Sequence, residues 1–203
     1  MHDRIMLWLS NGKRIDGLWV GTYYQTNADQ VMRRVEDGLS LIKQCDPKTY
    51  NRIVRDLERV WVIIIASSAG EYRDSIGACV LDERFVLADT TDAELLAGAI
   101  VHEATHARLW RCGIGYEEHL RQRVEAICFR QMLAFARHLP DGQGVREWAE
   151  AGLGASQASY TDAGMQERQL EDVIPTMRYL GAEWLGRIFV AISKWRASKS
   201  RKR

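Results

Sequence analysis

The chain has 203 residues, of which 46% are hydrophobic and 27% are charged. This composition is that of an ordinary globular protein and excludes a disordered or fibrous one. A chain of this length can bury its own core, so we expect one domain over residues 1–203. The net charge of +1 gives no indication of nucleic acid as a partner.

The cysteines are widely spaced and form no CxxC pair; they are Cys45, Cys79, Cys112 and Cys128. They indicate reduced core thiols rather than a disulfide framework or a thiolate zinc knuckle. The apolar run at residues 5–9 is too short for a signal peptide, and no stretch approaches the length that spans a bilayer. We therefore expect a cytoplasmic protein without a membrane partner, although export without a signal would leave no trace in the sequence.

Positive charge is concentrated at the end of the chain, in Lys194, Arg196, Lys199, Arg201, Lys202 and Arg203. Such a run is typical of a solvated, fraying terminus. Its alternative role is contact with an acidic partner.

Residues 1–60 are expected to form an N-terminal hairpin followed by helices. Two apolar runs, 5–9 and 18–24, flank Asn11-Gly12, a pair that favours a tight hairpin turn. Asn27 and Gln30 resemble a capping box that starts a helix reaching about residue 44.

A second helix is expected to begin at Asp46-Pro47, where an N-cap residue precedes a proline. Tyr50, Ile53, Val54 and Leu57 supply its buried face.

Residues 61–140 are expected to hold the sheet and two long helices. The run 61–65 is apolar on both faces, as in a central strand, and short strands follow at 78–81 and 85–88. The capping box 91–94 then starts a helix that ends at Cys112-Gly113.

A further helix should run from about Glu117 to His138. Residues 141–203 are expected to be helical, with a loop at 152–159, a break near Pro175 and a final amphipathic segment at 183–195. The fold class predicted from these elements is α+β, with a helical C-terminal part.

The motif His102-Glu103-Ala104-Thr105-His106 lies within the first of the two long helices. Histidines four residues apart lie one helical turn apart, so both can bind one cation at the 2.0–2.1 Å of Zn–N bonds. Glu103 can hold the attacking water as general base and later protonate the leaving amine. The alternative is a chance coincidence of these residues on one helix.

This HExxH motif, together with a later helix that carries Glu125, resembles the zincin metallopeptidases and, within them, the glutamate-ligand branch called gluzincins. The resemblance covers roughly residues 60–140. It implies a zincin-like fold, in which a small sheet lies against the motif helix and its edge strand binds extended peptide. The ligands of Zn²⁺ would then be His102, His106 and Glu125.

The resemblance also concerns two neighbouring positions. Thermolysin-like enzymes keep a tyrosine between the second histidine and the ligand glutamate that hydrogen-bonds the developing oxyanion, and Tyr116 stands there. A packing role for Tyr116, or Tyr160 in its place, is the alternative. Members of the branch often place an aspartate four residues after the glutamate to orient the first histidine, but Phe129 occupies that position, which leaves the role unassigned.

Glu125 has competitors for the position of third ligand. Cys112 comes six residues after the second histidine, about 240° around a helix, and so points away from the histidine face. Glu118 and His119 lie too close to the start of their helix. The remaining alternative is that Glu125 forms an ion pair with Arg121, four residues earlier.

The sequence therefore predicts a zinc metallopeptidase that acts on a peptide or protein substrate. One alternative is a non-peptidase zinc amidohydrolase, because the same constellation can serve a smaller substrate. The other is a non-catalytic interaction protein with a structural zinc. Four protein ligands close a structural site, whereas a catalytic site keeps one position open.

Overall fold

The computed structural model describes residues 2–66 and 68–200, with side chains for residues 3–66 and 68–193. The chain forms two compact units, Met1–Ser156 and Gln157–Arg203. The fold class is α+β, as predicted, with a helical C-terminal part. That residues 1–203 fold as one domain stays a prediction. The basic side chains from Lys194 onward lie outside the described residues, so their contact with an acidic partner also stays a prediction.

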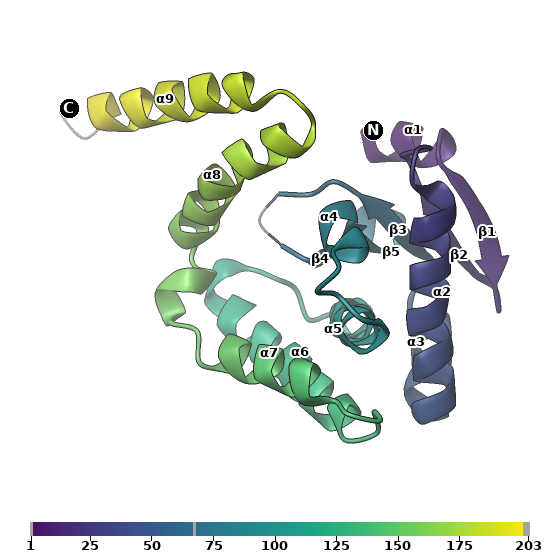
Figure 1. Cartoon of the computed structure of the whole chain (residues 1–203). Helices are drawn as coiled ribbons and strands as arrows, with labels where there is room; N and C mark the ends of the chain where they lie inside the picture. Colours follow the sequence, from purple (N-terminus) through teal and green to yellow (C-terminus); the bar gives the residue numbers. More distant parts are fainter. Residues whose placement is uncertain (1, 67, 201–203) are drawn as a thin grey trace. The chain divides into compact units, whose positions relative to one another are not determined.

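The first unit contains a mixed sheet whose strand order is β1-β2-β3-β5-β4 (Figure 1). The strands are β1 (Asn11–Ile15), β2 (Leu18–Thr22), β3 (Arg59–Ile63), β4 (Gly70–Arg73) and β5 (Ala78–Asp82). Strands β2, β3 and β5 run parallel, whereas β1 and β4 pair antiparallel at the two edges. The sheet therefore has an antiparallel strand at each edge.

Strand β3 is central, as its apolar sequence predicts. Val60 and Val62 are buried on one face of the sheet against the larger core cluster. Trp61 and Ile63 are buried on the other face in a smaller cluster. This alternation follows from the period of two in a strand, so both faces must be covered.

Among the helices that contribute to the larger cluster are α2 (Ala28–Cys45), α3 (Pro47–Asp56) and α5 (Ala93–Arg111). The short α1 (His2–Trp8) packs Met6 and Leu7 against the smaller one. Figure 1 shows α5 nearly end-on, with α2 on one side and α6 on the other. Helix α5 is thus held by both helices and by the sheet.

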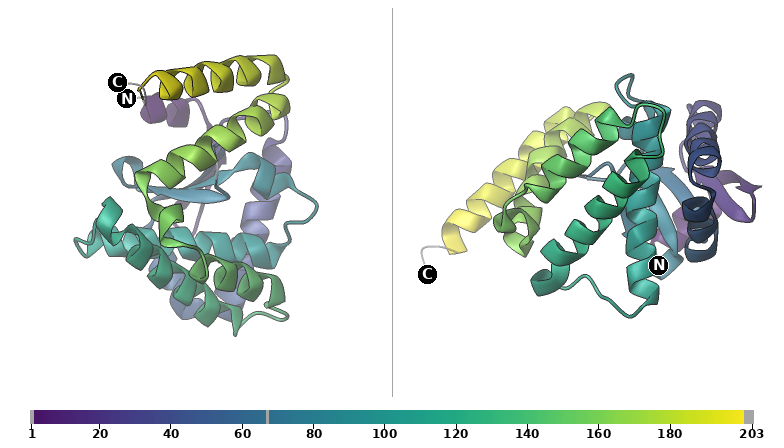
Figure 2. Two further views of the ribbon diagram at one scale, coloured as in Figure 1. Left: turned by 90° about the vertical axis from the view of Figure 1, so that its left-hand side faces the viewer. Right: turned by 90° about the horizontal axis from the view of Figure 1, so that it is seen from below.

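The remaining elements of the first unit are η1 (Asp74–Ile76), α4 (Glu83–Leu87), α6 (Glu118–Ala136) and α7 (Gln143–Leu153). Helices α6 and α7 pack together, as both views of Figure 2 show.

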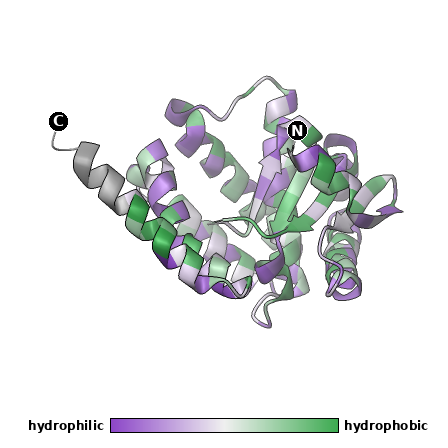
Figure 3. Cartoon of the chain, turned by 90° about the horizontal axis from the view of Figure 1, so that it is seen from above, coloured by the Kyte–Doolittle hydropathy of each residue, from purple (hydrophilic) through white to green (hydrophobic). Residues whose placement is uncertain are grey.

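The second unit contains η2 (Gln157–Tyr160), α8 (Asp162–Tyr179) and α9 (Glu183–Ser200). Several apolar side chains of α9 are exposed: Trp184, Leu185, Ile188, Phe189 and Ile192. In Figure 3 this part of α9 is the green stretch that precedes the grey residues. No described helix is both long and apolar enough to cross a membrane.

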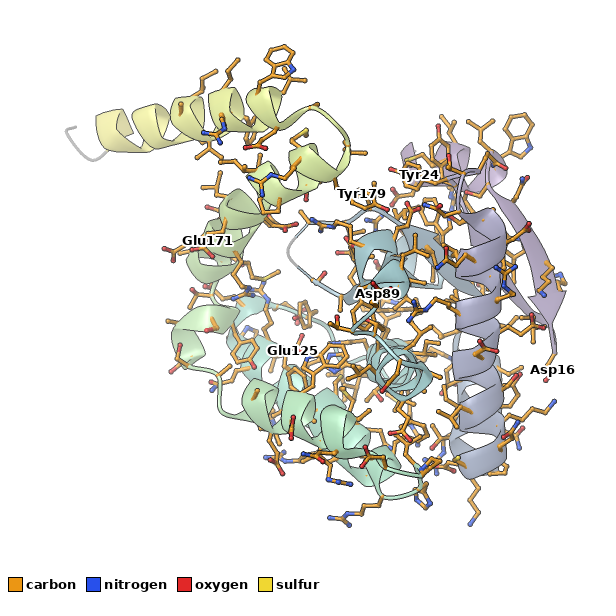
Figure 4. The ribbon with its side chains drawn as sticks, in the orientation of Figure 1. Asp16, Tyr24, Asp89, Glu125, Glu171 and Tyr179 are labelled. Atoms are coloured by element: carbon orange, nitrogen blue, oxygen red, sulfur yellow. The ribbon has the colours of Figure 1, made fainter. Side chains whose placement is uncertain are left out.

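The N-terminal hairpin was predicted around the wrong turn. Residues 5–8 belong to α1, and the turn is Asp16-Gly17 rather than Asn11-Gly12, which begins β1. Asp16 (φ 50°) and Gly17 (φ 91°) both adopt the positive φ that a type I′ turn requires. Asp16 marks this hairpin tip in Figure 4. Asp-Gly favours the same turn as Asn-Gly, so the two pairs compete in the sequence.

The strand predicted at 85–88 is wrong, because these residues lie in or directly after α4. The Asp82 carboxylate accepts hydrogen bonds from the backbone N–H groups of Arg84 (2.7 Å) and Phe85 (3.3 Å). This is N-capping, so the residues between the two predicted strands begin a helix instead.

Helix α2 begins and ends about where predicted, but its predicted cap is absent, and the predicted break near Pro175 is wrong. Asn27 precedes α2 but makes no side-chain cap; its Nδ2 donates to Glu83 Oε1 at 3.3 Å. Helix α8 continues past Pro175, and Gly181 (φ 73°) follows its end. A proline removes one helical hydrogen bond without necessarily ending the helix.

Candidate metal centre

The two histidines lie on helix α5, and both ends of this helix are well defined. Asp92 caps its start by accepting a hydrogen bond from the Leu95 backbone N–H at 2.8 Å. Cys112 and Gly113 (φ 77°) follow its end, as predicted. Between these ends the helix is continuous, so His102 and His106 lie one turn apart on the same face.

The histidines meet Glu125 of α6, whose position Figure 4 marks. His102 Nε2 lies 3.2 Å from His106 Nε2 and 3.1 Å from Glu125 Oε2. His106 Nε2 lies 3.4 Å from Glu125 Oε1. In a tetrahedral site with bonds of about 2.0–2.1 Å, neighbouring ligand atoms are about 3.3–3.4 Å apart. The separations come close to these values, with His102 facing Oε2 and His106 facing Oε1 of the Glu125 carboxylate.

Glu125 is buried, with 9% of its surface exposed. Burial alone would raise the pKa of its carboxyl, but hydrogen bonds with His102 and His106 outweigh burial and lower it. The carboxylate is thus stabilised as an anion by the two imidazoles. A charged carboxylate beside two imidazoles is a donor set that binds zinc.

Tyr116 lies at the same site. Its hydroxyl donates a hydrogen bond to Glu125 Oε1, and its ring stands edge-on to that of His106, with centroids 5.3 Å apart. Burial of the hydroxyl and the neighbouring Glu125 carboxylate raise the pKa of Tyr116. The hydroxyl therefore keeps its proton and remains a hydrogen-bond donor at neutral pH.

Glu103 is buried next to the edge of the sheet, with 6% of its surface exposed. A Cβ atom added to Gly70, the first residue of β4, would lie 3.2 Å from Glu103 Oε1. Burial raises the pKa of Glu103, while His102 and His106 partly offset this effect. Glu103 is therefore held between the histidine pair and the edge strand.

Cys128 is a residue of this site that the sequence prediction missed. Donor atoms of His102, His106 and Cys128 all lie within 4.8 Å of one another. Cys128 is fully buried on α6, three residues after Glu125, so the two share a helix face. The spacing of three residues from Glu125 was the signal in the sequence that could have placed Cys128 at the site. A role as an apolar core residue explains a buried cysteine equally well.

The residues set aside as ligands lie apart from the cluster or at the surface. Cys112 is exposed at the end of α5. Glu118 and His119 are exposed in the first turn of α6. The guanidinium of Arg121 lies over the Tyr116 ring, 5.3 Å from its centroid.

The position that lacks the expected aspartate is filled by apolar groups. The ring of Phe129 lies edge-on to His102, with centroids 4.6 Å apart. Met132 Sδ lies 3.2 Å from His102 Nδ1. A thioether is a weak hydrogen-bond acceptor, so Met132 can accept a hydrogen bond from Nδ1–H, which leaves the Nε2 lone pair for a metal ion. The sequence prediction also missed this role of Met132.

A separate surface cavity of about 370 Å³ lies between α2 and the first turns of α5, lined by Gln30, Arg33, Arg34, Asp37, Asp92, Ala93 and Leu96. It does not include the histidine cluster. In comparisons with protein-family models, curated proteins and solved structures, none matches this chain.

Proposed function

We propose that the protein is a zinc-dependent hydrolase, most specifically a metallopeptidase. The observation that carries this proposal is the set of separations between His102, His106 and Glu125, which fit the edges of a tetrahedral zinc site. Glu103 lies beside this set on α5. This combination resembles the HExxH site of the glutamate-ligand zincins.

The residues of the site have separate roles in this proposal. His102, His106 and Glu125 hold the metal ion, which supplies Lewis acidity and acidifies water when bound. Glu103 accepts the proton of the attacking water and returns it to the leaving amine. Its raised pKa, caused by burial, suits a group that must both accept and donate a proton. Tyr116 keeps its hydroxyl proton, and in this proposal it turns that proton from Glu125 Oε1 to the developing oxyanion.

An extended peptide is the proposed substrate because strand β4 begins beside Glu103. Among the described strands, β4 stands at one edge of the sheet and pairs only with β5. A strand edge offers unpaired backbone groups to which a peptide can add as a further strand. A peptide bound there would run past the carboxylate that acts as the base.

The proposal is tested by comparing the zinc-loaded wild type with Glu103→Gln on an internally quenched peptide library. The variant should retain zinc, because no ligand changes, and lose turnover by about 10²–10⁴-fold because the base is lost. Glu150→Gln, an exposed glutamate on α7, is the matched control and should retain activity. Wild-type turnover in Glu103→Gln would refute the assigned role, and hydrolysis of small amides alone would favour an amidohydrolase.

A structural zinc site in a non-catalytic protein is the second candidate. Cys128 favours this candidate, because its Sγ is a further donor atom and lies within 4.8 Å of a ring nitrogen of each histidine. Four protein ligands would close the site to water. This candidate would be supported if the wild type and Cys128→Ala both bind zinc and neither hydrolyses peptide.

A further inference from the structure

We infer that the Cys128 thiolate is a fourth ligand of the proposed zinc site, and that it keeps the resting site closed to water. This inference rests on the proposed function and concerns the regulation of the same site. Three ligands leave one tetrahedral position open, which the attacking water must enter. Cys128 would fill that position until it is displaced.

The geometry supports sulfur ligation. With Zn–N bonds of about 2.0–2.1 Å and a Zn–S bond of about 2.3 Å, nitrogen and sulfur atoms of a tetrahedral site are about 3.5–3.6 Å apart. The Cys128 Sγ and one ring nitrogen of each histidine lie within 4.8 Å of one another, so the sulfur must approach the nitrogens by at most about 1.3 Å. The thiol proton would leave to solvent as the metal–sulfur bond forms.

The placement of Cys128 on α6 also supports this role. Glu125 and Cys128 are three residues apart and share the face that meets α5. The Cys128 Sγ lies within 4.8 Å of a ring nitrogen of His106, the second histidine of the motif. Both donors of α6 are thus presented to the histidines by one rigid helix.

Two of the other cysteines provide a contrast. Cys112 is exposed at the C-cap of α5, and Cys45 is half-buried at the end of α2. Neither is part of the cluster of donor atoms that includes Cys128. Cys112→Ala is therefore the matched control, since it removes a thiol without touching the proposed ligand set.

The test replaces zinc with Co²⁺ and records the absorption spectrum of the purified full chain. A cobalt–thiolate bond gives a near-ultraviolet charge-transfer band that nitrogen and oxygen ligands do not give. We expect this band in the wild type and in Cys112→Ala, and its loss in Cys128→Ala. Circular dichroism and a cobalt titration establish that each variant is folded and binds one ion.

Hydrolysis by the zinc-loaded proteins tests the closed resting state. Cys128→Ala should turn over peptide faster than the wild type, because the fourth position is then open to water. A cobalt spectrum without the band, or with the band unchanged in Cys128→Ala, overturns the ligand assignment while leaving the proposed function intact. If the wild type is active and Cys128→Ala is no faster, the closed state is overturned.

Failure of the proposed function gives a different pattern. If the charge-transfer band behaves as expected but neither protein hydrolyses peptide, the ligand assignment of Cys128 stands and the hydrolase proposal fails. If neither Co²⁺ nor Zn²⁺ binds to the wild type, the metal site itself is refuted.

Discussion

Glu125 Oε2 lies 3.1 Å from His102 Nε2, although the two side chains come from different helices. Each helix alone carries an incomplete donor set, with two imidazoles on α5 and the carboxylate on α6. The packing of α6 against α5 therefore creates the site. Glu125 also contacts His106, so its carboxylate connects both imidazoles.

Because the site spans two helices, removal of a ligand from either should lower the zinc content. His106→Ala and Glu125→Ala each delete one donor atom, so the purified variants should contain less zinc than the wild type by elemental analysis. His119→Ala, an exposed histidine at the start of α6, is the control and should retain zinc. A zinc affinity in Glu125→Ala equal to that of the wild type would remove Glu125 from the ligand set.

Gly70 provides a test of the contact between the edge strand and the base. A Cβ at this position would lie 3.1 Å from Leu81 Cδ2 and 3.2 Å from Glu103 Oε1, so Gly70→Ala should displace the carboxylate. We expect lower peptide turnover with unchanged zinc content, because no ligand is touched. The control is Gly144→Ala, whose Cβ would make an ordinary contact of 3.4 Å with Leu95.

If Gly70→Ala keeps wild-type turnover, β4 does not constrain Glu103. A simultaneous loss of zinc would instead show that the substitution disturbs α5 as a whole. The ratio of turnover to bound zinc therefore separates these outcomes.

The sequence predicts the residues that local periodicity controls. The spacing of His102 and His106 places them on one face of any helix, and Asp92 and Gly113 predict where that helix begins and ends. The ends and the histidine face of α5 depend on short stretches of chain, which is why the sequence could predict them. The meeting of Glu125 with both histidines was instead predicted from the resemblance to the glutamate-ligand zincins.

Other features depend on tertiary packing. Whether Cys128 joins the donor atoms or only fills the core depends on how α6 is rotated against α5, which no local pattern fixes. Strand β4 has no apolar alternation in its sequence and is held by backbone pairing with β5, so it was not predicted. Strand β4 and Cys128 nevertheless complete the surroundings of the site.

An ion pair near the end of α5 should make the stability depend on pH. The Asp56 carboxylate accepts two hydrogen bonds from Arg55, both 2.8 Å long, and lies 3.6 Å from Arg111 Nη1. The hydrogen bond from Arg55 holds the pKa of Asp56 below its usual value, against the effect of burial. The unfolded value is about 3.9, so the stabilisation is present above that pH and is lost as the pH falls through the lower folded value.

Asp56→Asn should therefore reduce the free energy of unfolding near neutral pH by about 1 kcal/mol or less, because Arg55 is exposed to solvent. The difference from the wild type should shrink at acidic pH, as urea denaturation at several pH values can measure. Asp89→Asn, an exposed aspartate in the loop before α5, is the control. A difference that does not change with pH would show that the charge of Asp56 contributes nothing.

Met132 should tune the affinity of the site for zinc without being a ligand. Its Sδ lies 3.2 Å from His102 Nδ1, the ring nitrogen opposite the one directed at Glu125. Met132→Leu keeps the volume of the side chain, so it should cost less than about 1.5 kcal/mol of stability. The substitution removes the sulfur atom that accepts a hydrogen bond from Nδ1 of His102.

Loss of a hydrogen-bond partner behind a metal ligand typically lowers affinity about 10–100-fold, and we expect the lower end of this range because a thioether is a weak acceptor. Competition with a chromophoric chelator measures the zinc affinity, with Met32→Leu on α2 as the control, since Met32 packs in the core outside the site. Wild-type affinity in Met132→Leu would mean that the packing of Phe129 alone is sufficient to orient His102.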